Sequence, residues 1–407
     1  MLKTAFHNTR GLDDGFGMHI ACFIPSLFGG GAERVVLNLC NGWSRAGHKV
    51  NIVVAEASGA FRDQIPINVE LVNLGTIKVR KSIGKLAQYI DDRRPDVLCS
   101  HLSHANIAAI RAVRKSNAKP KCVVVEHLTM SAYKGVKLRD KFIRPIARRV
   151  YRHADAIIAV SKGAARDLEQ TLSLPPESVH VIYNPVVTDT MMNKANLDND
   201  QRWFQDEVPV VLGVGRLTPQ KDFTTLISAF AIARKQRALR LVLLGTGELQ
   251  SKLESQVRSL GLEEDILLAG FSKNPYSWMT QANLFVLSSR WEALPTVLIE
   301  AMACGCNVVA TDCPSGPAEI LVEDLARGLV PVGDSDKMAE KILYMLQNPI
   351  DSHRLRQWPT HLSLTSNPAM HICNYLKKSN KSSVSFEKAR STHWLWIRSS
   401  RKNSLLY

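Results

Sequence analysis

The chain has 407 residues, of which 45% are hydrophobic and 22% are charged, and its formal net charge is +15. At about 150 residues per domain this length predicts two or three domains, and the composition is typical of a globular protein rather than a disordered one. The positive charge favours an anionic partner. Because no zinc-finger spacing or aromatic RNA-binding run is present, phosphate groups or an anionic membrane surface are favoured over nucleic acid.

The cysteines and the apolar runs indicate the compartment. Several of the eight cysteines lie within apolar runs such as KCVVVEH, which is typical of reduced, buried thiols in a cytoplasmic protein. Cys304 and Cys306 have no matching second pair, so a zinc site is not expected there. No run approaches the roughly 18 apolar residues that span a bilayer, and the polar start predicts no secretory signal. We expect residues 1–17 to be a disordered extension, with Met18 as an alternative start to Met1.

Short apolar runs alternate with longer amphipathic segments in the first half of the chain. Strands are predicted at HIACFIP, KVNIVVAE, PDVLCSH, KCVVVEH and ADAIIAVS, and a helix is predicted at AERVVLNLCNGWSRAG, ending at Gly47. This alternation predicts a parallel sheet with helices on both faces. Pro185 follows the apolar run VHVIY and ends the unit, so the first domain is placed at residues 18–185.

The alternation restarts after a polar linker at residues 186–206. Strands are predicted at VPVVLGVGRL, LRLVLLGTG, DILLAG, ANLFVLSS and NVVAT, with helices at DFTTLISAFAIARKQR and SKLESQVRSLGL. The second domain is placed at residues 207–350, further helices within 351–378, including NPAMHICNYLKK, and an irregular basic tail at 379–407. The predicted fold class is α/β, with two tandem doubly wound Rossmann-like domains that face a cleft.

Two loops at the carboxyl ends of predicted strands carry groups that suit phosphate, and ligands bind at such ends in parallel sheets. Gly30 and Gly31 precede the first helix, where glycine lets a phosphate approach the backbone and the helix N-terminus. A flexible turn is an equal alternative, because the run is not the GxGxxG pattern. Arg216 and Lys221 follow the first strand of the second unit and can neutralise a diphosphate. By position alone, solvated surface cations are the simpler explanation.

A pair of glutamates follows the predicted strand ANLFVLSS. Glu292 lies on the loop after this strand, whereas Pro295 and Thr296 are suited to begin a helix that contains Glu300. Because apolar residues flank Glu300 on both sides, its carboxylate is costly to bury without partners, which sugar or ribose hydroxyls could provide. The alternative is a Glu300 that faces solvent and an ordinary loop residue at position 292.

His127 ends the predicted strand KCVVVEH and is expected to face the cleft. An imidazole there could donate to a sugar hydroxyl or stabilise charge. A lone histidine is more often structural, so by itself this residue is weak evidence.

Residues 134–155 combine an apolar stripe with many cations. Leu138, Phe142, Ile146 and Val150 recur at helical spacing, and the basic set between them is Lys137, Lys141, Arg144, Arg148, Arg149 and Arg152. Such a helix can dock on anionic lipid. The alternative is an ordinary helix whose stripe packs on the core and which Pro145 bends or breaks.

Together, these motifs resemble those of the retaining glycosyltransferases of family 4, which have the GT-B architecture. The similarity extends over residues 18–345 and includes FIPSLFGGGAERVVLNL, GVGRLTPQKDFTTLISAF and ANLFVLSSRWEALPTVLIEAMACG. Its most specific element is a glutamate, seven residues and a second glutamate, here Glu292 and Glu300. The sequence after Asn348 departs from the family pattern, in which the last helix usually crosses back onto the first unit.

The resemblance implies a role for each candidate residue. Arg216 and Lys221 match the pair that holds the donor diphosphate, and Glu300 matches the residue that binds ribose hydroxyls. Glu292 matches the residue that contacts the transferred sugar, and His127 matches a histidine near that sugar. The implied catalytic set is Glu292, His127, Arg216 and Lys221.

The resemblance also implies that Gly30 and Gly31 close over phosphate and sugar, and we expect donor contacts at Leu294, Pro295 and Thr296. The implied reaction is a front-face displacement in which the leaving diphosphate takes the proton of the acceptor hydroxyl. Such a reaction needs no metal or other cofactor, and no Asp-x-Asp metal motif is suitably placed.

The prediction is therefore a glycosyltransferase that moves a hexose or N-acetylhexosamine from a nucleoside diphosphate sugar, with a UDP-sugar as first candidate. The expected acceptor is a glycan or lipid-linked oligosaccharide in surface polysaccharide or lipopolysaccharide biosynthesis, met at the inner face of the cytoplasmic membrane. Two alternatives stay open. One is a sugar-nucleotide epimerase or a phosphorylase on the same architecture, and the other is a degenerate relative that only binds nucleotide.

Overall fold

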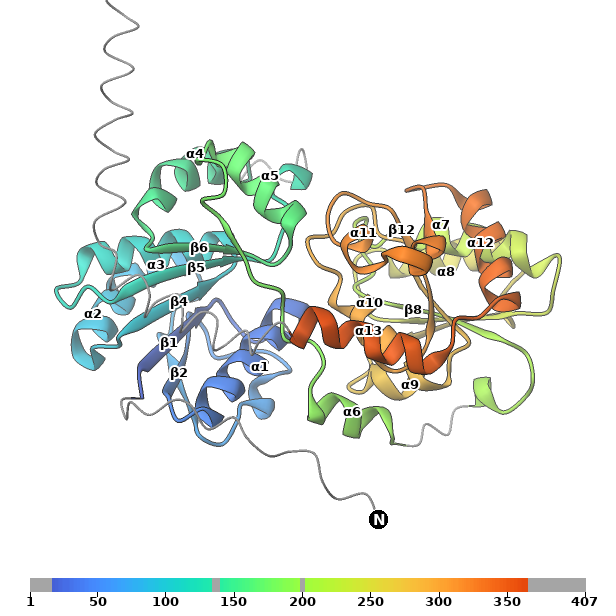
Figure 1. Ribbon diagram of the computed structural model, residues 1–407, viewed down its shortest axis with the longest axis horizontal. Helices are drawn as coiled ribbons and strands as arrows, with labels where there is room; N and C mark the ends of the chain where they lie inside the picture. Colours follow the sequence, from blue (N-terminus) through green and yellow to red (C-terminus); the bar gives the residue numbers. More distant parts are fainter. Residues whose placement is uncertain (1–16, 134–139, 198–201, 365–407) are drawn as a thin grey trace, which may run out of the picture.

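The structure, a computed structural model, describes residues 17–133, 140–197 and 202–364 (Figure 1). The expected extension lies outside this part except for Gly17, and so do the helix expected at NPAMHICNYLKK and the basic tail. The described residues form two α/β lobes that lie beside each other, each built on its own parallel sheet (Figure 1).

The first domain has a seven-stranded sheet in the order β3-β2-β1-β4-β5-β6-β7, in which every strand pair is parallel. The strands are β1 (His19–Ile24), β2 (Lys49–Val54), β3 (Val69–Asn73), β4 (Val97–His101), β5 (Lys121–Glu126), β6 (Ala156–Ala159) and β7 (His180–Val181). The helices are α1 (Gly31–Arg45), α2 (Ile83–Arg93), α3 (Ser103–Lys115), α4 (Asp140–Val150) and α5 (Lys162–Leu172).

The second domain has a six-stranded sheet in the order β10-β9-β8-β11-β12-β13, again with parallel pairs throughout. Its strands are β8 (Val210–Val214), β9 (Arg240–Leu244), β10 (Ile266–Gly270), β11 (Leu284–Leu287), β12 (Asn307–Thr311) and β13 (Leu329–Val330). Its helices are α7 (Phe223–Arg234), α8 (Gln250–Leu260), α9 (Pro275–Gln281), α10 (Thr296–Ala303), α11 (Pro317–Ile320) and α12 (Ser335–Gln347). The predicted fold class, two tandem Rossmann-like domains, is therefore confirmed.

The pattern of burial explains why the strands were readable in the sequence. All residues of β4, β6, β11 and β12 are buried, as expected for parallel strands covered by helices on both faces. Helix α1 instead buries one stripe, which includes Val36, Leu39, Cys40 and Trp43. The seven cysteines of the described part are all free and buried, as expected for reduced thiols. In the same part of the chain no helix is both long enough and apolar enough to cross a membrane.

Two helices lie in segments with little apolar periodicity, and one of them, α13 (Ser352–Leu364), falls within residues 351–378, where further helices were expected. Helix α6 (Asp189–Ala195) forms within the expected linker and packs on α9, since Asn274 donates to the Lys194 carbonyl over 2.9 Å. Helix α13 packs on α10, and Trp358 donates to the Ile320 carbonyl over 2.8 Å. Both segments therefore extend the second domain.

Candidate active site

Glu292 lies on the loop between β11 and α10, where its carboxylate is held from two sides. Lys221 donates from Nζ to Oε1 over 2.6 Å, and Ser289 donates from Oγ to the same oxygen over 2.7 Å. The Lys221 and Glu292 side chains are only 15% and 8% exposed, so the ion pair offsets the cost of desolvating two charges. The other carboxylate oxygen, Oε2, takes part in neither of these two contacts.

The loop that carries Lys221 is fastened to the loop that carries Glu292. Ser288 donates from Oγ to the Lys221 carbonyl over 2.7 Å. Arg290 donates from Nε to Asp222, the residue after Lys221, over 2.9 Å. These contacts fix Lys221 and Glu292 relative to each other before a ligand binds. Ser288, Arg290 and Asp222 were not predicted as site residues, because the bonded partners are 67 and 68 residues apart and share no local motif.

Arg216 follows β8 and is exposed at the carboxyl edge of the second sheet. Its loop packs tightly on the loop after β9, because a Cβ at Gly245 would lie 1.9 Å from the Gly215 carbonyl oxygen. Gly245 also has a φ of +144°, so glycine is required there for two reasons. Arg216 and Lys221 thus both follow β8 at the carboxyl edge of the sheet, where the resemblance expects the diphosphate.

Glu300 lies one turn into α10. It is partly exposed, whereas Leu298, Ile299 and Met302 in the same helix are buried. Desolvation raises the pKa of its carboxyl to about 7, although Arg34 and Lys221 act in the opposite direction. Arg34 belongs to α1, so the first domain contributes positive charge near Glu300. A poorly solvated carboxylate can accept hydrogen bonds from the hydroxyl groups of a ligand.

The start of α10 lies against the glycine loop of the first domain. A Cβ at Gly31 would lie 3.5 Å from Thr296 Oγ1, so the two loops are in contact range. Gly30 is the N-cap residue of α1, and the helix has no side-chain cap. Leu294 and Pro295 are buried, so their donor contacts would come chiefly from the backbone. The N-termini of α1 and α10 thus lie close together, and the Glu33 carboxylate accepts from the backbone at the start of α1.

His127 directly follows β5 and lies close to the Glu292 loop. Thr129, two residues later, donates from Oγ1 to the Glu292 carbonyl over 2.6 Å. Desolvation lowers the pKa of His127 to about 4, so its ring is neutral at neutral pH. Its Nε2 lies 3.0 Å from Nδ1 of His101, the last residue of β4. Thr129 and His101 were not predicted as site residues, since neither belongs to a recognisable motif.

A second contact joins the domains beside this site. Glu319 of α11 accepts hydrogen bonds from the backbone N–H groups of Lys162 and Gly163, over 2.9 and 2.7 Å, and from the Tyr183 hydroxyl over 3.1 Å. The Glu319 carboxylate, from the second domain, thus lies at the N-terminus of helix α5 of the first domain, where the helix dipole stabilises its charge. Glu319 was not predicted as a site residue, because it lies 157 and 156 residues from Lys162 and Gly163.

The basic segment is only partly what the sequence predicted. Lys137 and the side chain of Lys141 lie outside the described residues. Arg144 is not on the exposed face, because it donates to the Met130 and Ser131 carbonyls.

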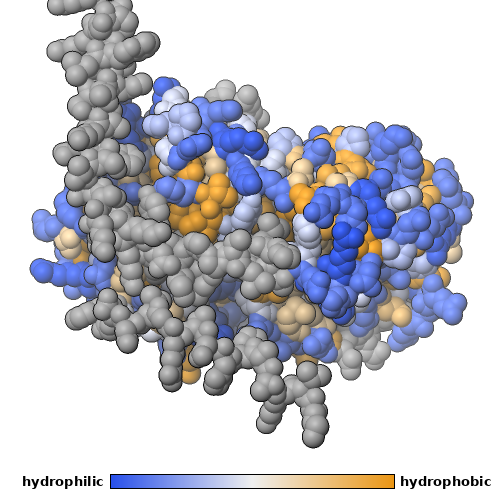
Figure 2. All heavy atoms as spheres, viewed as in Figure 1, coloured by the Kyte–Doolittle hydropathy of each residue, from blue (hydrophilic) through white to orange (hydrophobic). Residues whose placement is uncertain are grey.

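The stripe expected in this segment is also shifted. Ile146 is 36% exposed, whereas Ala147 and Val150 are buried, and Leu138 and the Phe142 side chain are not described. Pro145 does not break α4, which is continuous from Asp140 to Val150. Arg148, Arg149 and Arg152 are exposed as expected. Figure 2 shows hydrophilic residues at the top of the first lobe, with a hydrophobic patch directly below them.

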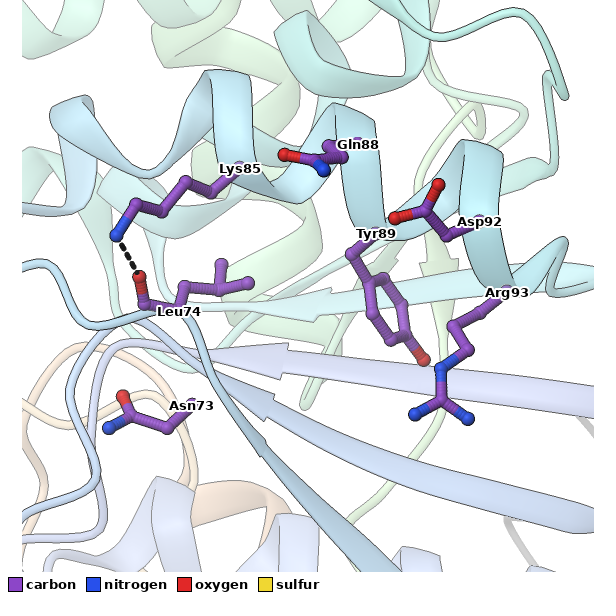
Figure 3. Close-up of a pocket in the computed structure, with 7 residues that line it drawn as sticks. All are labelled: Asn73, Leu74, Lys85, Gln88, Tyr89, Asp92 and Arg93. Atoms are coloured by element: carbon purple, nitrogen blue, oxygen red, sulfur yellow. Dashed lines mark hydrogen bonds between the residues drawn. The ribbon is translucent and has the colours of Figure 1, made fainter.

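A hollow of about 330 Å³ lies away from these residues, between β3 and α2 (Figure 3). Its lining is polar and includes Asn73, Lys85, Gln88 and Arg93, and Lys85 donates to the Leu74 carbonyl over 2.8 Å. None of the predicted site residues lines it.

Both halves of the chain match family models. Residues 29–190 match the model described as Glycosyltransferase Family 4, and residues 196–358 match Glycosyl transferases group 1. The chain is also similar to the solved structure of Anabaena HepE in complex with UDP and glucose. That similarity has a TM-score of 0.70 at 22% identity and covers 90% of this chain and all of that one.

Two curated relatives extend the comparison. The N-acetylgalactosamine-N,N'-diacetylbacillosaminyl-diphospho-undecaprenol 4-alpha-N-acetylgalactosaminyltransferase of Campylobacter jejuni is 30% identical over 347 residues, which are 81% of this chain and 90% of the relative. The lipopolysaccharide 1,6-galactosyltransferase of Salmonella typhimurium is 24% identical, over 75% of this chain and 83% of the relative. This chain therefore belongs to glycosyltransferase family 4 and is a glycosyltransferase with the GT-B fold.

Proposed function

We propose that this enzyme moves a hexose or N-acetylhexosamine, with retention of configuration, from a UDP-sugar to a glycan or lipid-linked acceptor in surface polysaccharide synthesis. The observation that carries the proposal is the Lys221–Glu292 ion pair beside the exposed Arg216. Two cations and a carboxylate match the diphosphate and the sugar hydroxyls of such a donor.

The related proteins support the choice of donor and acceptor. The HepE structure contains UDP and glucose, and the name of the Campylobacter relative describes a diphospho-undecaprenol-linked acceptor. UDP-sugars and lipid-linked glycans are therefore the first substrates to test.

In the proposed reaction the acceptor oxygen attacks the anomeric carbon on the face that the diphosphate leaves. The new C–O bond forms as the bond to the phosphate oxygen breaks, and the acceptor proton passes to that phosphate oxygen. Arg216 and Lys221 stabilise the charge that develops on the leaving diphosphate. Glu292 positions the sugar through Oε2, and Glu300 binds the ribose hydroxyls. These two cations supply the stabilisation in our proposal, and no metal takes part.

The backbone of the glycine loop completes the proposed donor site. Gly30 and Gly31 bring the N-terminus of α1 to the start of α10, where Thr296 lies. The donor phosphates would bind between these helix ends. His127 would donate to the transferred sugar from the first-domain side.

Purified enzyme would be incubated with UDP- and GDP-sugars and with undecaprenyl-diphosphate-linked glycans. We expect transfer from at least one UDP-sugar and a product with retained anomeric configuration by NMR. Absence of both transfer and donor hydrolysis across the panel would contradict the proposal, and binding of UDP without turnover would identify a degenerate relative. Adding a chelator tests whether the reaction needs a metal. Activity that is lost with chelator and restored with Mg²⁺ would contradict the proposal that no metal takes part.

We also propose that Arg148, Arg149 and Arg152 bring the enzyme to an anionic membrane surface, where a lipid-linked acceptor would lie. Liposomes containing anionic lipid should retain the protein at low salt, and the triple alanine variant should bind several-fold less. Equal retention of both proteins, or retention of neither, would contradict this part of the proposal.

A further inference from the structure

A buried chain of three polar side chains ends at His127. Cys99 and His101 lie two residues apart on β4, so both point to the same face of the sheet. The Cys99 Sγ lies 3.5 Å from His101 Nε2, and His101 Nδ1 lies 3.0 Å from His127 Nε2. Cys99 and His101 are completely buried, whereas His127 is partly exposed.

The sheet register brings the two imidazoles together. His101 pairs with Val125 across β4 and β5, and His127 follows two residues after Val125. The ring centroids are 5.2 Å apart and the rings are tilted by 33°, so the contact is between ring nitrogens rather than stacked faces. Both nitrogens of His101 are thereby used, and only Nδ1 of His127 is left for a ligand.

Neither ring carries a positive charge at neutral pH. Burial lowers the pKa of His101 well below its ordinary value, with a smaller effect from His127, and burial also lowers the pKa of His127 to about 4. A neutral imidazole has one N–H and one bare nitrogen, so one ring must donate and the other must accept. The pKa of Cys99 is raised by its contact with Cys22 and by burial, so this residue is a thiol.

Two proton arrangements satisfy the chain, and they leave opposite groups on His127. In the first, the Cys99 thiol donates to His101 Nε2, His101 donates from Nδ1 to His127 Nε2, and His127 carries its proton on Nδ1. In the second, every bond is reversed, and an imidazole N–H points at a thiol sulfur, which is a weak acceptor. The Cys99 proton has two possible acceptors, the sulfur of Cys22 and Nε2 of His101. A thiol sulfur is a weak acceptor, so the proton is better directed at the bare imidazole nitrogen, which favours the first arrangement.

We propose that His101 is a positioning residue that, with Cys99 behind it, holds His127 as the Nδ1–H tautomer. His127 then presents a fixed hydrogen-bond donor toward the donor sugar rather than a base. This inference rests on the proposed role of His127 in transfer, but the tautomer itself is a property of the free protein. A neutral, oriented donor suits an oxygen that gains negative charge during the reaction.

The direct test is ¹⁵N NMR of the full chain labelled at histidine, without substrate, at neutral pH. A His127→Gln variant assigns the His127 signals by their loss. We expect Nδ1 of His127 to be protonated and Nε2 to be bare. A His127 that is protonated on Nε2, or on both nitrogens, overturns the proposal, whatever the enzyme's activity.

Matched variants separate positioning from folding. Cys99→Ser keeps a hydroxyl donor and should preserve the tautomer, whereas Cys99→Ala should let a substantial fraction of His127 shift its proton to Nε2. An unchanged tautomer in Cys99→Ala would overturn the role of Cys99. Thermal unfolding of each variant checks that the fold persists.

The kinetic test uses His101→Asn, which keeps an amide donor near the Nδ1 position, and His101→Leu, which keeps none. We expect His101→Leu to lower kcat of transfer about tenfold with donor KM little changed, and His101→Asn to restore most of that loss. Equal kcat in the two variants would overturn the positioning role. If the wild-type protein transfers no sugar at all, the proposed function fails while the NMR result still decides the tautomer.

Discussion

The two domains contribute different kinds of groups to the candidate site. The second domain contributes a bonded set of charges, in which Lys221 and Ser289 both reach Glu292. The first domain contributes a glycine loop without a side-chain cap and a neutral histidine that is backed by His101. The second domain thus supplies charges that bond to one another, whereas the first domain supplies backbone, a neutral histidine and the more distant charge of Arg34.

This difference indicates a separate role in transfer for each domain. Charge that develops on a diphosphate needs preorganised cations, which cost little reorganisation because the loops of β8 and β11 already hold them. A closing surface instead needs small groups that approach phosphate and sugar closely, which Gly30 and Gly31 allow. Substitutions in the second domain should therefore affect catalysis more than those in the first.

The largest effect is expected for Lys221→Ala. It removes a cation from the leaving diphosphate and leaves the Glu292 carboxylate buried without its ion-pair partner. We expect kcat/KM for transfer to fall about 100- to 1,000-fold, the range for loss of one preorganised charge partner. Lys235→Ala, at an exposed lysine after α7, is the matched control and should keep full activity. A fall in kcat/KM of less than threefold in Lys221→Ala would show that the charged groups of the second domain contribute little to catalysis.

The pH dependence of UDP binding should follow Glu300. Because its pKa is raised to about 7, the carboxyl is partly protonated at neutral pH and becomes a full hydroxyl acceptor only above that value. We expect UDP affinity to rise about tenfold from pH 6 to pH 8 and to level off beyond, as measured by calorimetry. The rise should disappear in Glu300→Gln. An affinity that falls with pH, or a slope that persists in that variant, would point to another group.

The same raised pKa has the opposite consequence for folding without ligand. The Glu300 carboxyl stabilises the folded state only when protonated, so its contribution is complete below its unfolded pKa of about 4.5 and is lost as pH rises through about 7. UDP should therefore stabilise the protein more at pH 8 than at pH 6 in thermal unfolding.

A smaller effect is expected for Glu319→Gln, which weakens the contact between the domains. The amide keeps an acceptor for one helix N–H but loses the charge that favours the N-terminus of α5. We expect transfer to slow about fivefold, with UDP binding unchanged and a larger radius of gyration in small-angle scattering. Glu323→Gln, at an exposed site nearby, is the control. Unchanged scattering and rate would show that this contact does not hold the domains together.

The smallest effect is expected for Thr129→Val, which keeps the shape of the side chain but removes its hydroxyl. The lost bond is the one from Thr129 Oγ1 to the Glu292 carbonyl, and a neutral hydrogen bond contributes about 1 kcal/mol. We expect about a threefold to fivefold loss in kcat/KM. A loss as large as that of Lys221→Ala would mean that the first domain is not the minor contributor.

The features that could be predicted from the sequence are those determined by neighbouring residues. The strands of both cores, the helix that contains Glu300 and the loop position of Glu292 could be predicted because buried runs and helix-start residues lie next to each other in the chain. The edge strand β3 was missed, because only one of its five residues is buried and its apolar signal is weak. The inward turn of Arg144 and the contacts of Thr129 and Glu319 were missed because each depends on a distant backbone group.

The most direct measurement is calorimetry of UDP binding to Glu292→Ala and Glu300→Ala, combined with their transfer rates. Glu300→Ala should weaken UDP binding at least about tenfold, because the ribose hydroxyls lose a buried acceptor. Glu292→Ala should bind UDP as well as wild type or better, because Lys221 is released for the diphosphate, yet should transfer sugar at least about 100-fold more slowly. Wild-type binding and wild-type transfer in both variants would contradict the division of roles proposed for these two glutamates.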